Sequence, residues 1–164
     1  MTRTRPVLQI QRLRPDDVER FREIRLRSLR DAPTMFGSTF EDVVTHPPES
    51  WRQQLEQLAT FVAVADHSDV GVVRGGAYTR RPNAAILYSM WVEPAFRGRG
   101  VGEALIDTVV DWARSGGFAS LVLDVTHDNE HAIALYARKG FVRIDDEGAP
   151  DLDRDKEHRR ELRL

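Results

Sequence analysis

Cysteine is absent from the 164-residue sequence. A chain without thiols cannot form disulfide bonds, bind zinc or an iron–sulfur cluster through thiolates, or use a cysteine nucleophile. A covalent intermediate would therefore need another nucleophile. The sequence also has no Gly-x-Ser-x-Gly element, which argues against a serine hydrolase of the nucleophile-elbow type.

Long hydrophobic runs are missing too. Runs such as residues 84–87 and 121–123 are far shorter than the roughly 20 apolar residues of a membrane-spanning helix. The basic N-terminus, residues 1–5, is not followed by the apolar core and small-residue cleavage site of an export signal. We therefore expect a cytoplasmic protein with no membrane partner.

An excess of one charge sign is also lacking. The 24 basic and 26 acidic residues leave a net charge of −2, whereas nucleic-acid-binding domains more often carry a pronounced basic excess. No nucleic-acid partner is therefore expected. Only Lys139 and Lys156 are lysines, so 22 of the 24 basic residues are arginines. We interpret this bias as genome composition in preference to a binding patch.

Length and periodicity predict one α+β domain over residues 1–164, because a chain of this size is typical of a single domain. Apolar runs and alternation predict strands at residues 7–13, 61–65, 70–79, 84–92, 121–125, 141–144 and 158–164. Apolar residues three or four apart predict helices at residues 16–30, 49–58, 101–115 and 129–139. The expected architecture is a twisted, mixed and mostly antiparallel sheet of six to seven strands, flanked by about four helices.

A glycine-rich loop joins the strand predicted at residues 84–92 to the helix that begins near residue 101. It reads Arg97-Gly98-Arg99-Gly100-Val101-Gly102. Glycines let the free backbone amides of a helix N-terminus approach an anion, which the helix dipole also favours. The loop therefore predicts a phosphate or pyrophosphate site, to which the two arginines add mobile positive charge. A tight turn with a purely structural purpose is the alternative.

Two familiar phosphate-binding loops fit this segment poorly. A nucleoside-triphosphate loop needs Lys and then Ser or Thr after its last glycine, but Glu103 and Ala104 stand there. A dinucleotide fingerprint accommodates Gly98, Gly100 and the later acid Asp124, but its third glycine would be Glu103. The antiparallel strands predicted before the loop also disagree with a dinucleotide-binding domain.

A second motif follows the strand predicted at residues 121–125. It begins 32 residues after Arg97 and reads Asn129-x-x-Ala132-x-x-Leu135-Tyr136-x-x-x-Gly140-Phe141. Together with the earlier Arg97-x-x-Gly100-x-Gly102, it resembles the GNAT superfamily of N-acetyltransferases. The resemblance covers the entire chain in element order, and about residues 84–141 residue by residue. It implies a single GNAT-type domain.

The resemblance implies acetyl-coenzyme A as the co-substrate, with no metal. Its pyrophosphate would bind the loop formed by Arg97, Gly98, Arg99, Gly100, Val101 and Gly102. Its pantetheine arm would pair, like an added strand, with the bulged backbone at Met90, Trp91 and Val92. Asn129 would contact the same arm, and a backbone amide near Val92 would polarise the acetyl carbonyl.

Tyr136 would bind the cofactor and serve as the general acid that protonates the departing thiolate. A phenol with a pKa of ~10 keeps its proton at neutral pH and can donate it inside a dry cleft. The alternative is a core aromatic residue on an amphipathic helix.

The attacking amine needs a proton acceptor, because a lysine-like amine (pKa ~10.4) or an α-amino group (pKa ~8) is mostly protonated at neutral pH. Asp124 lies twelve residues before Tyr136, where protein N-terminal acetyltransferases of the family carry a Glu. Glu93, before the glycine-rich loop, is a second candidate base, and Ser89 or Tyr88 could hold a water molecule. Asp124 could instead be a solvated or helix-capping carboxylate.

Two histidines four residues apart, His127 and His131, have a spacing that can hold zinc on a helix. Asp124 could supply a third ligand. His127, however, falls in the loop before the predicted helix, and no distant partner suggests itself. We expect no metal.

The acceptor is not identified by the sequence. The resemblance implies that residues 16–58 and the acidic segment before the last strand cover the acceptor site. Glu41 or Asp42 could bind a cationic acceptor, and the acidic residues Asp145, Asp146 and Glu147 could attract an amine. Both groups could equally be solvated surface.

The predicted function is direct transfer of acetyl from acetyl-coenzyme A to a primary amine of a small molecule or protein, in a ternary complex. The absence of cysteine favours this route over a thiol-bound acyl-enzyme. A non-catalytic module that binds acyl-coenzyme A, as a sensor or interaction domain, is the alternative. Family members are often dimers, so a homodimer is among the expected assemblies.

Overall fold

The computed structural model describes residues 7–34, 38–145 and 152–164. In chain order the elements are β1 (Gln9–Arg12), α1 (Val18–Asp31), α2 (Phe40–Val44), α3 (Pro48–Gln57), β2 (Ala59–Ala65), β3 (Ser68–Ala77), β4 (Ala84–Val92), the 3₁₀ turn η1 (Pro94–Phe96), α4 (Val101–Ser115), β5 (Ser120–Thr126), α5 (Glu130–Arg138), β6 (Val142–Ile144) and β7 (Glu157–Arg163). Within these three ranges no helix is both long and apolar enough to cross a bilayer.

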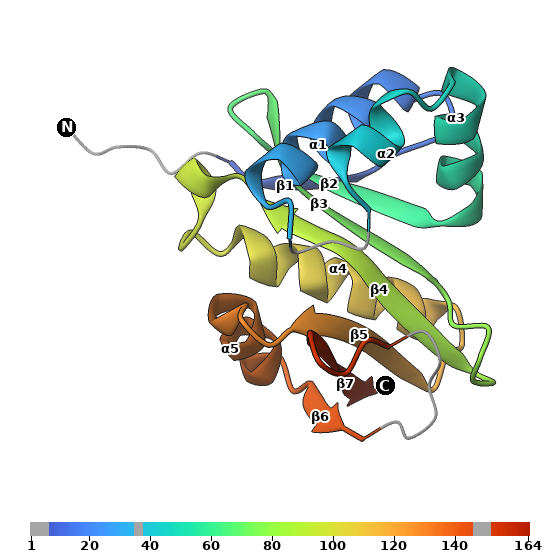
Figure 1. Cartoon of the computed structure of the whole chain (residues 1–164), viewed down its shortest axis with the longest axis vertical. Helices are drawn as coiled ribbons and strands as arrows, with labels where there is room; N and C mark the ends of the chain where they lie inside the picture. Colours follow the sequence, from blue (N-terminus) through green and yellow to red (C-terminus); the bar gives the residue numbers. More distant parts are fainter. Residues whose placement is uncertain (1–6, 35–37, 146–151) are drawn as a thin grey trace.

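One seven-stranded sheet runs through the molecule in the order β1-β2-β3-β4-β5-β7-β6 (Figure 1). Every neighbouring pair is antiparallel except β4 and β5, which run parallel. The structure confirms the expected α+β fold with a mixed, mostly antiparallel sheet. Its seven strands are the higher of the two predicted numbers.

The sheet opens between its two central strands. β4 and β5 pair only from Ala84–Ser120 to Ile86–Val122 and then diverge, as Figure 1 shows. The remainder of β4 therefore has a free backbone edge on the side of β5. The opening lies at the carboxyl ends of both strands.

A bulge in β4 lies beside this opening. Val72 of β3 pairs with Trp91 and Arg74 pairs with Tyr88, so one residue of β3 faces both Ser89 and Met90 of β4. Ser89 adopts a positive φ of 56°, the left-handed conformation that side chains rarely take. A bulge of this kind bends the strand and re-aims the side chains that follow it.

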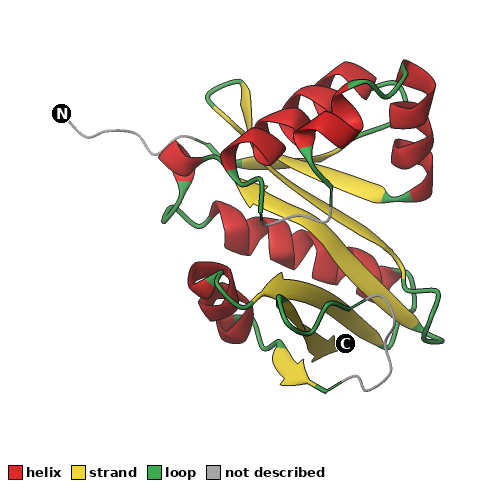
Figure 2. Ribbon diagram, in the orientation of Figure 1, coloured by secondary structure: helices red, strands yellow, loops and turns green. Residues whose placement is uncertain are grey.

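Helices cover both faces of the sheet (Figure 2). On one face, α4 and α5 bury residues such as Leu105, Val109 and Tyr136 against the inward-facing apolar residues of the sheet. On the other face, α1 and α3 bury Phe21 and Trp51 in a second cluster with β2, β3 and β4. In each layer the apolar side of the helices faces the sheet, as the spacing of apolar residues in the sequence predicts.

The described residues contain five α-helices, one more than expected. The additional helix is the short α2, which lies in the polar segment at residues 34–48. Thr39 and Asp42 form a reciprocal capping box at its N-terminus, with Thr39 N–H donating to the Asp42 carboxylate at 2.9 Å. Local caps of this type stabilise a helix that has too few apolar residues for a periodic pattern.

Candidate active site

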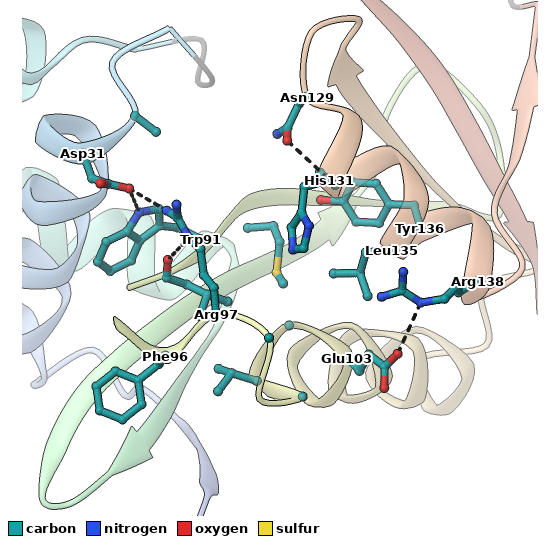
Figure 3. A pocket seen from close by; sticks show the side chains of 18 of the residues that line it. Asp31, Trp91, Phe96, Arg97, Glu103, Asn129, His131, Leu135, Tyr136 and Arg138 are labelled. Atoms are coloured by element: carbon teal, nitrogen blue, oxygen red, sulfur yellow. Dashed lines mark hydrogen bonds and ion pairs between the residues drawn. The ribbon is translucent and has the colours of Figure 1, made fainter. Parts of the chain in front are cut away.

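A pocket of about 750 Å³ occupies the opening between β4 and β5. Its walls are the end of β4, the glycine-rich loop with the first turn of α4, one side of α5, and the end of α1 (Figure 3). Most of the residues predicted as cofactor-binding line it, namely Met90, Trp91, Val92, Arg97, Gly98, Gly100, Val101, Gly102, Asn129 and Tyr136. The two sequence motifs therefore meet in one cavity.

The glycine-rich loop presents open backbone to the pocket. Gly98 and Gly100 have positive φ angles of 74° and 82°, and a Cβ atom on either would meet nothing within 4 Å. Gly100 is the N-cap of α4, so the unpaired amides of the first helical turn face this space. The loop can therefore hold an anion through its backbone, as the sequence predicts.

Gly102 has a different purpose. A Cβ atom there would come within 2.9 Å of Leu135 on α5 and 3.2 Å of Met90 on β4. Its missing side chain lets α4, α5 and β4 approach one another closely at the base of the pocket.

Replacing Gly100 with Ala is expected to weaken coenzyme A binding at least about tenfold, because the new methyl group enters the space in front of the helix amides. Gly117, at the opposite end of α4, supplies the matched control, since it has a φ of 78° and equally open surroundings. Both substitutions should lower stability by about 1–2 kcal/mol. Calorimetric titration should show an affinity loss for Gly100→Ala alone, and an equal loss in both variants would count against the loop assignment.

Arg97 is not the mobile charge that the sequence suggests. Its guanidinium donates to Asp31 Oδ2 at 2.7 Å, and its Nε donates to the backbone oxygen of Val92 at 3.0 Å (Figure 3). The side chain therefore connects the loop to the end of α1 and to the end of β4. Arg99 lies over the ring of Phe96 and does not line the pocket.

Asp31 is a pocket residue that the sequence analysis missed. As the last residue of α1, it also accepts a hydrogen bond from the indole Nε1 of Trp91 at 2.9 Å. One carboxylate thus holds both the arginine of the loop and the tryptophan of β4. No motif marks such a contact, because it joins residues 60 or more positions apart.

α5 and its N-cap residue contribute further side chains to the pocket. Asn129 is the N-cap of the helix, and its side-chain oxygen accepts a bond from Ala132 N–H at 3.3 Å. His131 faces the cavity from the first turn, beside Leu135 and Tyr136 (Figure 3). His131 is another lining residue that the sequence analysis did not assign to the cofactor site.

Tyr136 is buried at the inner wall, with 5% of its surface exposed. Its ring packs against Phe141 in an edge arrangement at 5.8 Å, and no other described residue hydrogen-bonds to its hydroxyl. Burial raises the pKa of the Tyr136 hydroxyl above its usual value of 10. The phenol therefore stays protonated at neutral pH and has a proton to donate into the pocket.

The two predicted bases lie outside the pocket lining. Both oxygens of Asp124 accept hydrogen bonds from Arg159, at 2.8 and 3.0 Å, and Arg159 is itself fully buried. Glu93 accepts one bond, at 3.2 Å, from Arg27 on α1, and about a third of its side chain is exposed. The carboxylate of Asp124 is therefore committed to an internal ion pair, whereas Glu93 is the freer of the two.

Sequence comparison identifies the family of this chain. The Acetyltransferase (GNAT) family matches residues 19–141, which is most of the chain. The chain belongs to this family. It is 30% identical over 120 residues to a mycothiol acetyltransferase from Beutenbergia cavernae, covering 72% of this chain and 39% of that protein. It is also 40% identical over 58 residues to the N-alpha-acetyltransferase RimI of Mycobacterium tuberculosis, covering 35% of each chain. The chain thus spans less than half the length of these curated relatives.

Solved structures agree on the GNAT fold. A GNAT-family acetyltransferase from Streptococcus pneumoniae superimposes with a TM-score of 0.76 at 19% identity, over 96% of this chain and all of that chain. YncA from Salmonella typhimurium, solved with acetyl-CoA, gives a TM-score of 0.73 at 19% identity, over 96% and 94% of the two chains. At these identities the likeness is one of fold.

The histidines of this GNAT domain do not converge on a metal. His131 faces the pocket, whereas the ring of His127 stacks on His158 of β7 with centroids 5.2 Å apart. Among the described residues, no group of three or more His, Cys, Asp or Glu side chains is placed to hold an ion.

His127 and His158 instead form a hydrogen-bonded chain of fixed polarity. His127 Nε2 lies 2.9 Å from the Arg154 carbonyl, which only accepts, so this nitrogen carries the proton. His127 Nδ1 then accepts from His158 Nδ1 at 3.1 Å, and His158 Nε2 faces the donor Arg160 at 3.4 Å. Protonation of His158 would place an N–H group opposite the Arg160 donor and break this chain.

Stability of the GNAT domain is therefore expected to fall in acid. Burial, followed by the charges of Arg143, Arg160 and His127, lowers the pKa of His158 from 6.5 to about 4. The unfolded chain binds the extra proton between these values, so the contribution of His158 is complete above pH 6.5 and is lost toward pH 4, by about 2 kcal/mol. Urea unfolding at pH 7 and pH 4.5 should show a smaller difference in His158→Asn than in the wild type. Equal differences in both proteins would disprove the assignment.

Two of the carboxylates predicted to attract an acceptor amine are engaged in other contacts. Asp42 caps α2, and Asp145 pairs with Arg154 at 3.5 Å, so neither is an uncommitted carboxylate. Glu41 is exposed in the first turn of α2. Asp146 and Glu147, which the sequence analysis also considered, lie outside the described residues.

Proposed function

We propose that this GNAT protein transfers acetyl from acetyl-coenzyme A directly to a primary amine, with both substrates bound at once. One observation carries the proposal. The free edge of β4, the open amides at the start of α4 and the hydroxyl-bearing wall of α5 all face a single cavity. A long ligand with a phosphate at one end and a thioester at the other matches that arrangement.

The fit of coenzyme A rests on the shape of the loop and the strand. Gly98 and Gly100 have no Cβ atom, and the space where one would lie is open. A pyrophosphate therefore has room to approach the backbone amides. Glu93 N–H pairs with Val70 of β3, so the backbone groups of Val92 point toward the opening. Arg97 takes the Val92 oxygen, and the Val92 N–H remains for the bound ligand. Bound acetyl-coenzyme A supplies the activated acetyl group.

Tyr136 has the properties of the general acid in this scheme. Its hydroxyl is protonated, lies in the cavity wall and has no partner among the described residues that would compete for it. Donation of this proton neutralises the thiolate that leaves when the amine attacks. The same donor would have little effect on binding before the reaction.

Proton removal from the amine is assigned to Glu93 in preference to Asp124. The Glu93 carboxylate has one hydrogen-bond partner and access to solvent, so a water molecule can connect it to the opening. Asp124 is ion-paired with the buried Arg159, and protonation of Asp124 would remove the negative charge from this pair.

Release of free thiol from acetyl-coenzyme A, measured over a panel of amino acids, polyamines, peptides with free N-termini and aminoglycosides, tests the proposal. We expect turnover with at least one class, and mass spectrometry should find the acetyl group on nitrogen. Coenzyme A binding without turnover on any acceptor would instead support a non-catalytic acyl-coenzyme A-binding module.

A further inference from the structure

An ion pair joins α4 to α5 at the rim of the pocket. Glu103, in the first turn of α4, and Arg138, the last residue of α5, both line the pocket (Figure 3). Arg138 Nε lies 3.7 Å from Glu103 Oε1, and the side chains of Arg138 and Glu103 are 58% and 47% exposed. The distance is too long for a hydrogen bond, so the pair is a loose contact beside solvent.

Arg138 is the pocket-lining arginine that remains available to a ligand. Arg97, the other arginine of the lining, is held by Asp31 and by the backbone oxygen of Val92. Arg138 makes no hydrogen bond with any residue in the ranges that the structure describes. It follows Leu135 by three residues, on the side of α5 that faces the pocket. Its guanidinium can therefore turn to a bound group without breaking an internal hydrogen bond.

Glu103 has the opposite charge at a place where an anion is expected to bind. It is the third residue of α4, beside the free amides of the first turn that follow the N-cap Gly100. A carboxylate there stabilises the helix through its dipole, but it also repels a phosphate in front of the same amides. The rim of the pocket therefore has one charge that attracts a phosphate and, in contact with it, one that repels a phosphate.

The cofactor has more negative charge than the loop can balance. Coenzyme A carries a pyrophosphate and a 3′-phosphate, whereas a helix N-terminus contributes the equivalent of only about half a positive charge. The charge of Arg97 is shared with Asp31, and Arg99 does not line the pocket. A further cation is therefore expected to contact the phosphates at the rim.

We propose that Arg138 binds a phosphate group of coenzyme A, and that Glu103 competes with this phosphate for Arg138 in the free protein. A guanidinium binds phosphate through paired, charge-assisted hydrogen bonds, whereas the contact with Glu103 has none. Binding therefore exchanges a weak partner for a stronger one. The inference rests on the proposed use of acetyl-coenzyme A as the acetyl donor.

Calorimetric titration of coenzyme A at low ionic strength, where exposed charges are least screened, tests both residues. Arg138→Gln should weaken binding by about three- to tenfold, because the guanidinium contact is lost. Glu103→Gln should tighten binding by about two- to fivefold, because it removes the competitor. In turnover, KM for acetyl-coenzyme A should change in the same directions while kcat stays near the wild-type value.

A second ion pair between the same two helices supplies matched controls. Lys139 Nζ lies 2.7 Å from Oδ1 of Asp107, one turn beyond Glu103 on α4, and neither member of this pair lines the pocket. Lys139→Gln and Asp107→Asn therefore make the same changes of charge away from the cofactor. Both should bind coenzyme A within about twofold of the wild type. Thermal melting of all four variants should stay close to the wild type, since ion pairs at the surface contribute little to stability.

The double variant separates competition from simple repulsion. If Glu103 acts by occupying Arg138, Glu103→Gln should tighten binding much less in the Arg138→Gln background than in the wild type. An equal gain in both backgrounds would contradict the competition.

Dephospho-coenzyme A, which lacks the 3′-phosphate, identifies the phosphate that Arg138 contacts. If Arg138 binds the 3′-phosphate, Arg138→Gln should weaken the binding of coenzyme A and leave that of dephospho-coenzyme A unchanged. If Arg138 binds the pyrophosphate, both ligands should lose affinity by the same factor.

The inference is overturned if Arg138→Gln binds coenzyme A as tightly as Lys139→Gln, or if Glu103→Gln binds it no more tightly than Asp107→Asn. Failure of the proposed function is distinguishable from these results. The wild-type protein would then release no thiol with any amine, while the affinities of the variants would still decide the inference.

Discussion

Replacing Tyr136 with Phe is expected to lower kcat by ~10²- to 10³-fold, the usual contribution of a positioned general acid. The substitution removes only the hydroxyl, which faces the pocket and has no partner among the described residues. The packing of the ring against Phe141 should persist, so stability should change little. Thiol release under saturating acetyl-coenzyme A measures the effect directly.

The signature of an acid is a loss in kcat without a loss in cofactor affinity. Calorimetric titration of coenzyme A should therefore give the same dissociation constant for Tyr136→Phe and the wild type. Tyr78→Phe is the control, because it removes the hydroxyl of another buried tyrosine that bonds to Arg159 outside the pocket lining. Wild-type turnover in Tyr136→Phe would remove this residue from the mechanism.

Replacing Asp124 with Asn is expected to destabilise the protein by about 3–5 kcal/mol, because it removes the negative charge that accepts two hydrogen bonds from the fully buried Arg159. The amide keeps the shape of the side chain, so the loss reflects charge more than packing. Urea unfolding measures it. The double variant Asp124→Asn with Arg159→Met should recover much of the stability, because the buried cation is then absent as well.

Asp16→Asn provides the comparison for this effect. Asp16 forms an exposed ion pair with Arg52 at 3.2 Å, and loss of such a pair should cost less than about 1 kcal/mol. If Asp124→Asn were as stable as Asp16→Asn and lost only turnover, Asp124 would be a base and the structural assignment would be wrong. The two outcomes are separable because one concerns unfolding and the other concerns rate.

The sequence predicted the fold well where one local rule dominated. Alternating apolar residues located the strands, and the three- to four-residue spacing from Val101 to Trp112 located α4. It missed α2, since a five-residue helix stabilised by Thr39 and Asp42 carries no periodic pattern. Short capped helices depend on individual hydrogen bonds that a periodicity analysis does not count.

Prediction from the sequence named residues that meet around one pocket in the structure, where they are expected to act through the backbone. The glycines of the loop and the edge of β4 need only the right conformation, which Gly98 and Gly100 signal directly. It was less successful for charged side chains, because their roles depend on partners distant in sequence. Arg97 is engaged by Asp31, and Asp124 by Arg159, and neither partner belongs to a motif. Arg138 is likewise one of many arginines until the fold brings it to the pocket.

Calorimetric titration of coenzyme A into the wild-type protein tests the central claim, that the opening between β4 and β5 is a cofactor site. We expect saturable binding of one coenzyme A per chain, weakened at least about tenfold in Gly100→Ala and unaffected in Gly117→Ala. No binding to the wild type, or equal binding to all three proteins, would contradict the account.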